Sequence, residues 1–85
     1  MDLELVIEGV TDLRLVEDIK RQVRRVCKGA KRDGEWSVFV SPSETRGQWD
    51  LGVREPLGRH FAYFNTDRAD ELPRLVAEKM RTFLA

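Results

Sequence analysis

The chain has 85 residues, of which 15 are basic and 15 acidic, so its formal net charge is zero. This length predicts one small domain over residues 1–85, and the balanced charge excludes a strong overall attraction to nucleic acid or to anionic membranes. The single cysteine, Cys27, excludes an internal disulfide and a cysteine-based metal cage. An acidic N-terminus and the lack of a long apolar run predict a cytoplasmic protein.

In the first part of the chain, the sequence predicts a strand followed by a helix. Leu3, Leu5 and Ile7 alternate with polar positions, which is typical of a half-buried strand, and Gly9 ends it. Thr11 or Asp12 can cap the helix, because their side-chain oxygens accept from N–H groups of the first turn. The apolar positions of this helix recur every three or four residues and predict one buried stripe, made of Leu13, Val16, Ile19, Val23, Val26 and Cys27.

The rest of the chain predicts three strands and a second helix. Period-two alternation indicates strands over residues 35–41, 48–54 and 59–65. Between the last two, Pro56 and Gly58 predict a three-residue hairpin loop with a bulge. Asp67 or Asp70 should begin the last helix, whose expected buried stripe is Leu72, Leu75, Val76, Met80 and Phe83.

These elements predict the fold class. The order is β-α-β-β-β-α, and a right-handed crossover makes the first two strands parallel. The remaining strands should form an antiparallel meander, which gives a four-stranded mixed sheet in the order 1-2-3-4. Each helix has one apolar stripe, so both should cover the same face of the sheet. The expected architecture is therefore a two-layer α+β sandwich with one open sheet face.

The hairpin loop decides which side chains lie on the open face. A three-residue loop pairs Glu55 with Arg59, which sends Phe61 and Tyr63 into the core. The predicted partner-binding residues on the open face are then Phe39, Arg54, His60 and Phe64. A loop of four residues would shift the register by one, which would place Phe61 and Tyr63 on the open face instead of His60 and Phe64. The exposed rings could bind a partner or a second copy, or could simply cover the backbone of the sheet.

Charge is segregated along the chain although it sums to zero. Residues 1–18 contain six acids and one arginine, whereas residues 19–32 contain seven bases and no acid. We name the basic ridge as the predicted anion- or nucleic-acid-binding set, Arg21, Arg24, Arg25, Lys28, Lys31 and Arg32. An ordinary solvated helix face is the alternative, because bases near a helix C-terminus are favoured by the macrodipole.

The sequence favours binding over catalysis. His60 is the only histidine and has no second ligand at metal-binding spacing, so no metal site is expected. Cys27 falls on the buried stripe, where a thiol serves packing. No phosphate-binding glycine motif occurs, so the sequence indicates no cofactor, no small-molecule substrate and no enzyme.

The element order resembles that of the small ribosome-associated hibernation factors, which place both helices on one sheet face. In that family, basic residues of both helices form a surface that faces RNA. Here the second helix carries Arg74, Lys79 and Arg81 together with Asp70, Glu71 and Glu78, so half of such a surface is missing.

Two functional hypotheses follow from these patterns. The first is a non-catalytic protein-interaction module, an adaptor or regulator that uses the open face or the basic ridge to bind a protein partner or itself. The alternative is an RNA- or ribosome-binding domain that contacts phosphates through the arginines of the first helix.

Overall fold

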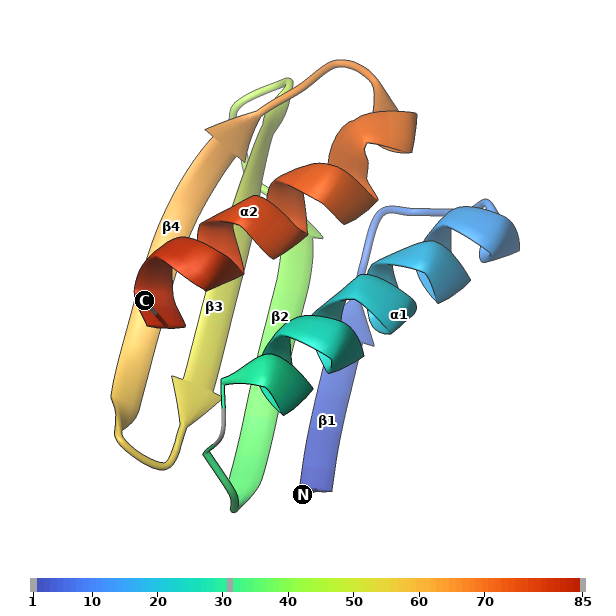
Figure 1. Ribbon diagram of the computed structural model, residues 1–85. Coiled ribbons are helices and arrows are strands. Elements are labelled where there is room, and N and C mark those ends of the chain that lie inside the picture. Colours follow the sequence, from blue (N-terminus) through green and yellow to red (C-terminus); the bar gives the residue numbers. More distant parts are fainter. Residues whose placement is uncertain (1, 31, 85) are drawn as a thin grey trace.

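The computed structural model describes residues 2–30 and 32–84 and confirms the predicted element order. The elements are β1 (Asp2–Ile7), α1 (Leu13–Gly29), β2 (Glu35–Pro42), β3 (Gln48–Glu55), β4 (Gly58–Asn65), η1 (Ala69–Glu71) and α2 (Leu72–Leu84). The sheet has the order β1-β2-β3-β4, with β1 parallel to β2 and the other neighbours antiparallel. Both helices lie on one face of the sheet, side by side and running in the same direction (Figure 1).

Local chemistry sets the beginning of each helix. The Asp12 carboxylate accepts a hydrogen bond of 2.9 Å from the backbone N–H of Arg14, which caps α1 as the sequence predicts. α2 begins differently, because the short 3-10 turn η1 precedes it and no side chain caps that turn. Pro73 lies in the first turn of α2, where a missing N–H leaves no helical hydrogen bond unmade.

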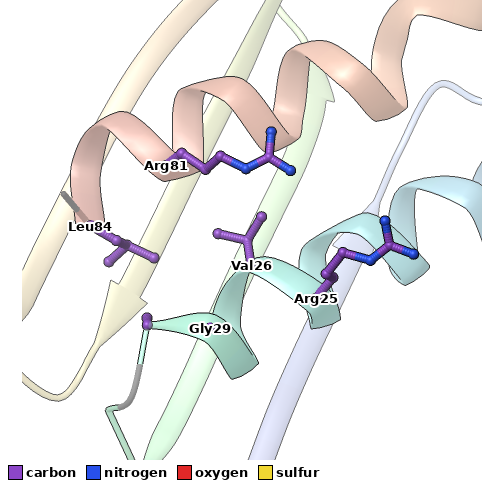
Figure 2. Close-up of a pocket in the computed structure, with 6 residues that line it drawn as sticks. Arg25, Val26, Gly29, Arg81 and Leu84 are labelled. Atoms are coloured by element: carbon purple, nitrogen blue, oxygen red, sulfur yellow. The ribbon is translucent and has the colours of Figure 1, made fainter.

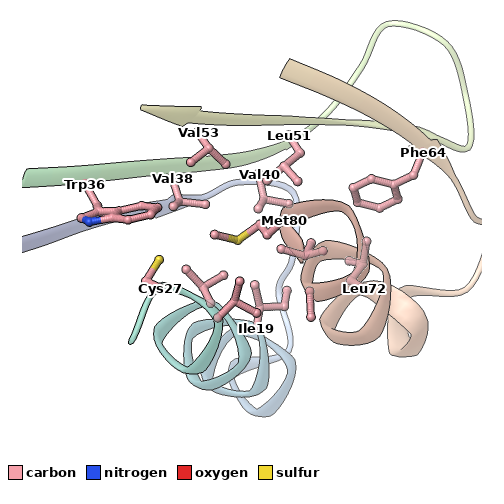
Figure 3. Close-up of a cluster of buried hydrophobic side chains, with 14 residues drawn as sticks. Ile19, Cys27, Trp36, Val38, Val40, Leu51, Val53, Phe64, Leu72 and Met80 are labelled. Atoms are coloured by element: carbon pink, nitrogen blue, oxygen red, sulfur yellow. The ribbon is translucent and has the colours of Figure 1, made fainter. Parts of the chain in front are cut away.

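The core lies between the helix layer and the sheet (Figure 3). Ile19 of α1, Trp36 of β2 and Met80 of α2 are almost completely buried. The indole N–H of Trp36 donates a hydrogen bond of 3.1 Å to the backbone carbonyl of Arg32, so the ring is buried without an unpaired donor. The other core residues are Val23, Val26, Cys27, Val38, Val40, Leu51, Val53, Phe64, Leu72, Val76 and Ala77.

The thiol of Cys27 is buried in this core, and burial raises its pKa to about 11. An unfolded thiol ionises near its ordinary pKa of about 8.5. We therefore expect the free energy of unfolding to fall as pH rises from about 8.5 to 11, by at most about 3 kcal/mol, since only the unfolded state ionises in that range. Urea unfolding at both ends of this range checks it, with Cys27→Ala as control. Equal losses in both proteins would contradict a role for the thiol.

The β3–β4 register differs from the predicted one. Glu55 pairs with Gly58, so the hairpin loop has two residues, Pro56 and Leu57, instead of three. The shift by one residue turns every β4 side chain to the opposite face. The prediction that Phe61 and Tyr63 join the core is therefore wrong. The two-residue loop instead places Phe61 and Tyr63 on the open face, the arrangement expected for a loop of four residues.

The face of the sheet that the helices leave uncovered follows from this register. We keep the name open face for its side chains, which lie in three main rows across the strands. The rows are Glu4–Ser37–Arg54–Arg59, Val6–Phe39–Gly52–Phe61 and Ser41–Asp50–Tyr63. Phe61 and Tyr63 are about 60% exposed, at 61% and 58%, and their rings meet edge to face at 5.1 Å.

Candidate functional site

The basic ridge begins along the solvent side of α1. Arg21, Arg24, Arg25 and Lys28 are all exposed, because the opposite side of the helix is packed on the sheet. Lys31 lies outside the described residues. The structure thus brings four of the six predicted residues together on one helix.

Part of this charge is neutralised by the same helix. Nη1 of Arg21 lies 2.8 Å from Oδ1 of Asp18, one turn earlier, and Nζ of Lys20 lies 3.8 Å from Oε1 of Glu17. Exposed pairs of this kind contribute little to stability, but they reduce the local positive potential. Within residues 2–30 and 32–84, Arg24, Arg25 and Lys28 form no ion pair, so their charges face solvent.

Arg32, in contrast, is separated from the ridge by its own ion pair. Its Nη1 lies 3.1 Å from Oε2 of Glu55, whose side chain is 1% exposed. Oε2 has no hydrogen bond in the described structure, so charge attraction rather than a well-formed hydrogen bond joins the two groups. The guanidinium of Arg32 is therefore paired with a buried carboxylate. The prediction that Arg32 belongs to an exposed anion-binding set does not fit this position.

A second arginine-lined surface extends the ridge toward α2. Arg25 of α1 and Arg81 of α2 border a hollow of about 260 Å³ near the C-terminal ends of the two helices. Figure 2 shows Val26 between the two arginines, with Gly29 and Leu84 at the end of the hollow. Arg81, like Arg25, forms no ion pair with any described residue. Sequence reasoning assigned Arg81 to no site.

Further along the helix–helix groove, the charges are balanced. A hollow of about 450 Å³ is lined by residues that include Asp18, Arg21, Asp70 and Arg74. Glu78 and Glu71 hold the Arg74 guanidinium at 3.0 and 2.9 Å, and these hydrogen bonds, that to Glu78 first, raise the pKa of Arg74. The excess positive charge is therefore concentrated at the end that carries Arg25 and Arg81.

This end of the helix layer is suited to bind anions. Guanidinium groups from two helices can contact one phosphate, or two phosphates in succession, and each group can donate two parallel hydrogen bonds. The C-terminal macrodipoles of the helices also favour arginines here, so local stability gives a competing reason for their presence. We name the anion surface as Arg24, Arg25, Lys28 and Arg81, the exposed bases at this end of the helix layer that form no ion pair in the described structure.

The predicted partner-binding set on the open face is only half correct in its placement. Phe39, 43% exposed, and Arg54 lie there as expected. Phe64 is 5% exposed and belongs to the core, and His60 stacks on Phe83 of α2 with ring centroids 5.1 Å apart. Placing His60 and Phe64 on the open face was wrong, because the two-residue loop turns both toward the helices.

Sequence reasoning also missed the buried carboxylate of Glu55. Its Oε2 atom lies 3.1 Å from Nη1 of Arg32, and its Oε1 atom lies 3.5 Å from Nε2 of His60. The signal was in the strand itself, since Glu55 continues the alternation of Leu51 and Val53 on the core face. His60 is therefore partly buried, between the carboxylate of Glu55 and the ring of Phe83 in α2.

Residues 2–30 and 32–84 contain neither a metal-binding cluster nor a membrane-spanning helix. No group of three or more His, Cys, Asp or Glu side chains is arranged to hold a metal ion there. No helix in this part of the chain has the length and apolar character needed to cross a membrane.

The fold is similar to that of two solved structures. A ribosomal subunit interface protein from Coxiella burnetii matches with a TM-score of 0.68 over 99% of this chain and 93% of that chain, at 18% sequence identity. The N-terminal domain of Protein Y from Thermus thermophilus matches with a TM-score of 0.66 over 99% and 96% of the two chains, at 13% identity. No protein-family model and no curated protein matches this chain in sequence. At these identities, the likeness concerns the fold.

Proposed function

We propose that this protein binds structured RNA, of the kind found in ribosomes, through the anion surface of Arg24, Arg25, Lys28 and Arg81. The single observation that carries the proposal is the set of four exposed bases, on two helices, that have no acidic partner among the described residues. The fold supports it, because one solved structure with the same fold is described as a ribosomal subunit interface protein. This favours the RNA-binding hypothesis over the adaptor hypothesis.

The chemistry of the anion surface favours the phosphates of an RNA over its nucleobases as the recognised groups. Leu84 and Val26 provide the apolar floor of the hollow, and no aromatic residue lines it on which a base could stack. Double-stranded RNA is recognised mainly by its shape and by phosphate and 2′-hydroxyl contacts, which need no aromatic side chain. The proposed ligand is therefore a helical or folded RNA segment, bound with little sequence preference. A binding role of this kind needs no catalytic group and takes place in the cytoplasm, where ribosomes are.

Binding to an RNA hairpin should weaken steeply with salt. If the four bases of the anion surface each contact a phosphate, the logarithm of the association constant should fall against the logarithm of salt concentration with a slope of about −3 to −4. Fluorescence anisotropy with a labelled hairpin measures this slope, and co-sedimentation with purified ribosomal subunits tests the same surface on the larger ligand. The absence of binding at low salt to both ligands would contradict the proposal.

A matched pair of double variants locates the surface. Arg25→Gln with Arg81→Gln should reduce the slope by about 2 and weaken binding at least about tenfold, because two phosphate contacts are lost. Arg46→Gln with Arg54→Gln removes the same charge from a loop and from the open face, and should leave binding within about twofold. Equal losses in both variants would show that only net charge matters and that the anion surface has no special role.

A further inference from the structure

The middle row of the open face has an unusual sequence of side-chain sizes. Val6, Phe39, Gly52 and Phe61 follow one another across the four strands as register partners. Gly52 leaves a hollow of about 270 Å³ bordered by Phe39 and Phe61. A cavity of about 150 Å³ is enough to hold a benzene ring, so this hollow can accept a phenyl side chain. The row therefore presents a large ring next to a space for a large ring.

The neighbouring row is asymmetric in charge. Glu4 stands on β1 and is followed by Ser37 on β2, whereas Arg54 and Arg59 stand on β3 and β4. Within the described residues, none of the three charged side chains forms an ion pair. One edge of the open face is thus acidic and the opposite edge basic at the same level along the strands.

We propose that the open face binds a second copy of this chain, in a face-to-face dimer whose twofold axis runs parallel to the strands between β2 and β3. This axis places each row over the same row of the second copy, with the order of the strands reversed. It places Phe39 over Gly52 of the second copy and Glu4 against Arg59 of the second copy. Sheets that pack face to face lie about 10 Å apart and within about 30° of parallel, which allows these rows to meet.

The orientation follows from shape as well as from charge. The other twofold axis in the plane of the interface runs across the strands and keeps β2 over β2. It would place Phe39 on its own equivalent and leave a gap over Gly52. With the axis along the strands, the two Phe39 rings enter the two hollows and lie beside each other across the axis, an arrangement that suits offset aromatic stacking.

The size of the face predicts weak association. Four strands about 4.8 Å apart and six residues rising about 3.3 Å each give roughly 400 Å² of flat area per copy. Stable interfaces bury about 800 Å² per partner. We therefore expect a dissociation constant on the order of 100 μM. Because the anion surface is on the other side of the molecule, this dimer is independent of RNA binding.

The test is the mass in solution as a function of concentration. Analytical ultracentrifugation should show the mass rising from 9.9 kDa toward twice that value as concentration increases. Gly52→Val should abolish the rise, because its side chain fills the hollow. The fold should survive, since a Cβ at Gly52 meets only Cδ2 of Phe39 at 3.9 Å. A mass that stays at 9.9 kDa up to about 1 mM would overturn the proposal.

Charge reversal gives the sharpest control. Glu4→Arg and Arg59→Glu should each weaken self-association at least about tenfold, because like charges then face each other in both equivalent pairs. An equimolar mixture of the two variants should form a heterodimer, since every facing pair is again of opposite charge. Heterodimer formation supports the stated axis. A mixture no better associated than the single variants, or an open face that binds oligouridylate while the protein stays monomeric, would overturn the proposal.

Discussion

Phe64→Ala should lower the free energy of unfolding by about 3–5 kcal/mol, whereas Phe61→Ala should lower it by about 0.5 kcal/mol or less. The two residues stand on the same strand, but Phe64 is 5% exposed between the sheet and α2, and Phe61 is 61% exposed on the open face. Truncating the buried ring removes apolar contacts and leaves a cavity. Chemical denaturation followed by tryptophan fluorescence measures both differences.

The comparison between these variants reports the register of the β3–β4 hairpin directly. A three-residue loop would bury Phe61 and expose Phe64, so the two effects would be exchanged. A larger loss in Phe61→Ala than in Phe64→Ala would therefore contradict the pairing of Glu55 with Gly58. Tyr63→Ala is a second exposed control and should resemble Phe61→Ala, since Tyr63 is 58% exposed on the same face.

Arg32→Met should destabilise the protein by about 3 kcal/mol, because it leaves the carboxylate of Glu55 in the interior without its guanidinium partner. The Glu55 side chain is 1% exposed, and only Nε2 of His60, at 3.5 Å, would remain beside it. Arg24→Met on the exposed face of α1 is the matched control and should change the free energy of unfolding by about 0.5 kcal/mol or less.

Glu55→Leu, the substitution of the partner of Arg32, tests whether the loss in Arg32→Met comes from the unpaired buried carboxylate. Glu55→Leu removes the buried charge, so Arg32→Met added to Glu55→Leu should cost at least about 2 kcal/mol less than it costs alone. A double-mutant cycle by urea denaturation measures this coupling. Additive effects of the two substitutions would show that Arg32 does not compensate the charge of Glu55.

The layers of the fold could be predicted from the sequence, because they depend on periodicity. The apolar stripe of α1 and the alternating apolar residues of β2 are both buried between the helices and the sheet, as their periodicity predicts. The β3–β4 register depends instead on the length of one loop. Proline at position 56 has a fixed negative φ, which excludes the common type I′ and II′ two-residue turns and favours a longer loop. The structure nevertheless has two loop residues, and this register places Phe64 under α2.

The candidate sites show the same limit. A helical wheel places Arg24, Arg25 and Lys28 on the solvent side of α1 without further information. It cannot show that Arg81 and Arg25 border the same hollow, because that arrangement depends on how the two helices lie side by side. Nor can it show that Arg32 turns toward Glu55, since the two residues are far apart in the chain and meet only through the sheet.

The ion pair between Arg32 and Glu55 also limits how the protein can respond to a ligand. An anion that drew Arg32 outward would leave a carboxylate unpaired in the interior, so this guanidinium is not a reserve of charge for binding. The count of bases between residues 19 and 32 consequently overstates the field that an approaching polyanion experiences. The strength of that field depends on which arginines already form ion pairs with acidic side chains of the same chain.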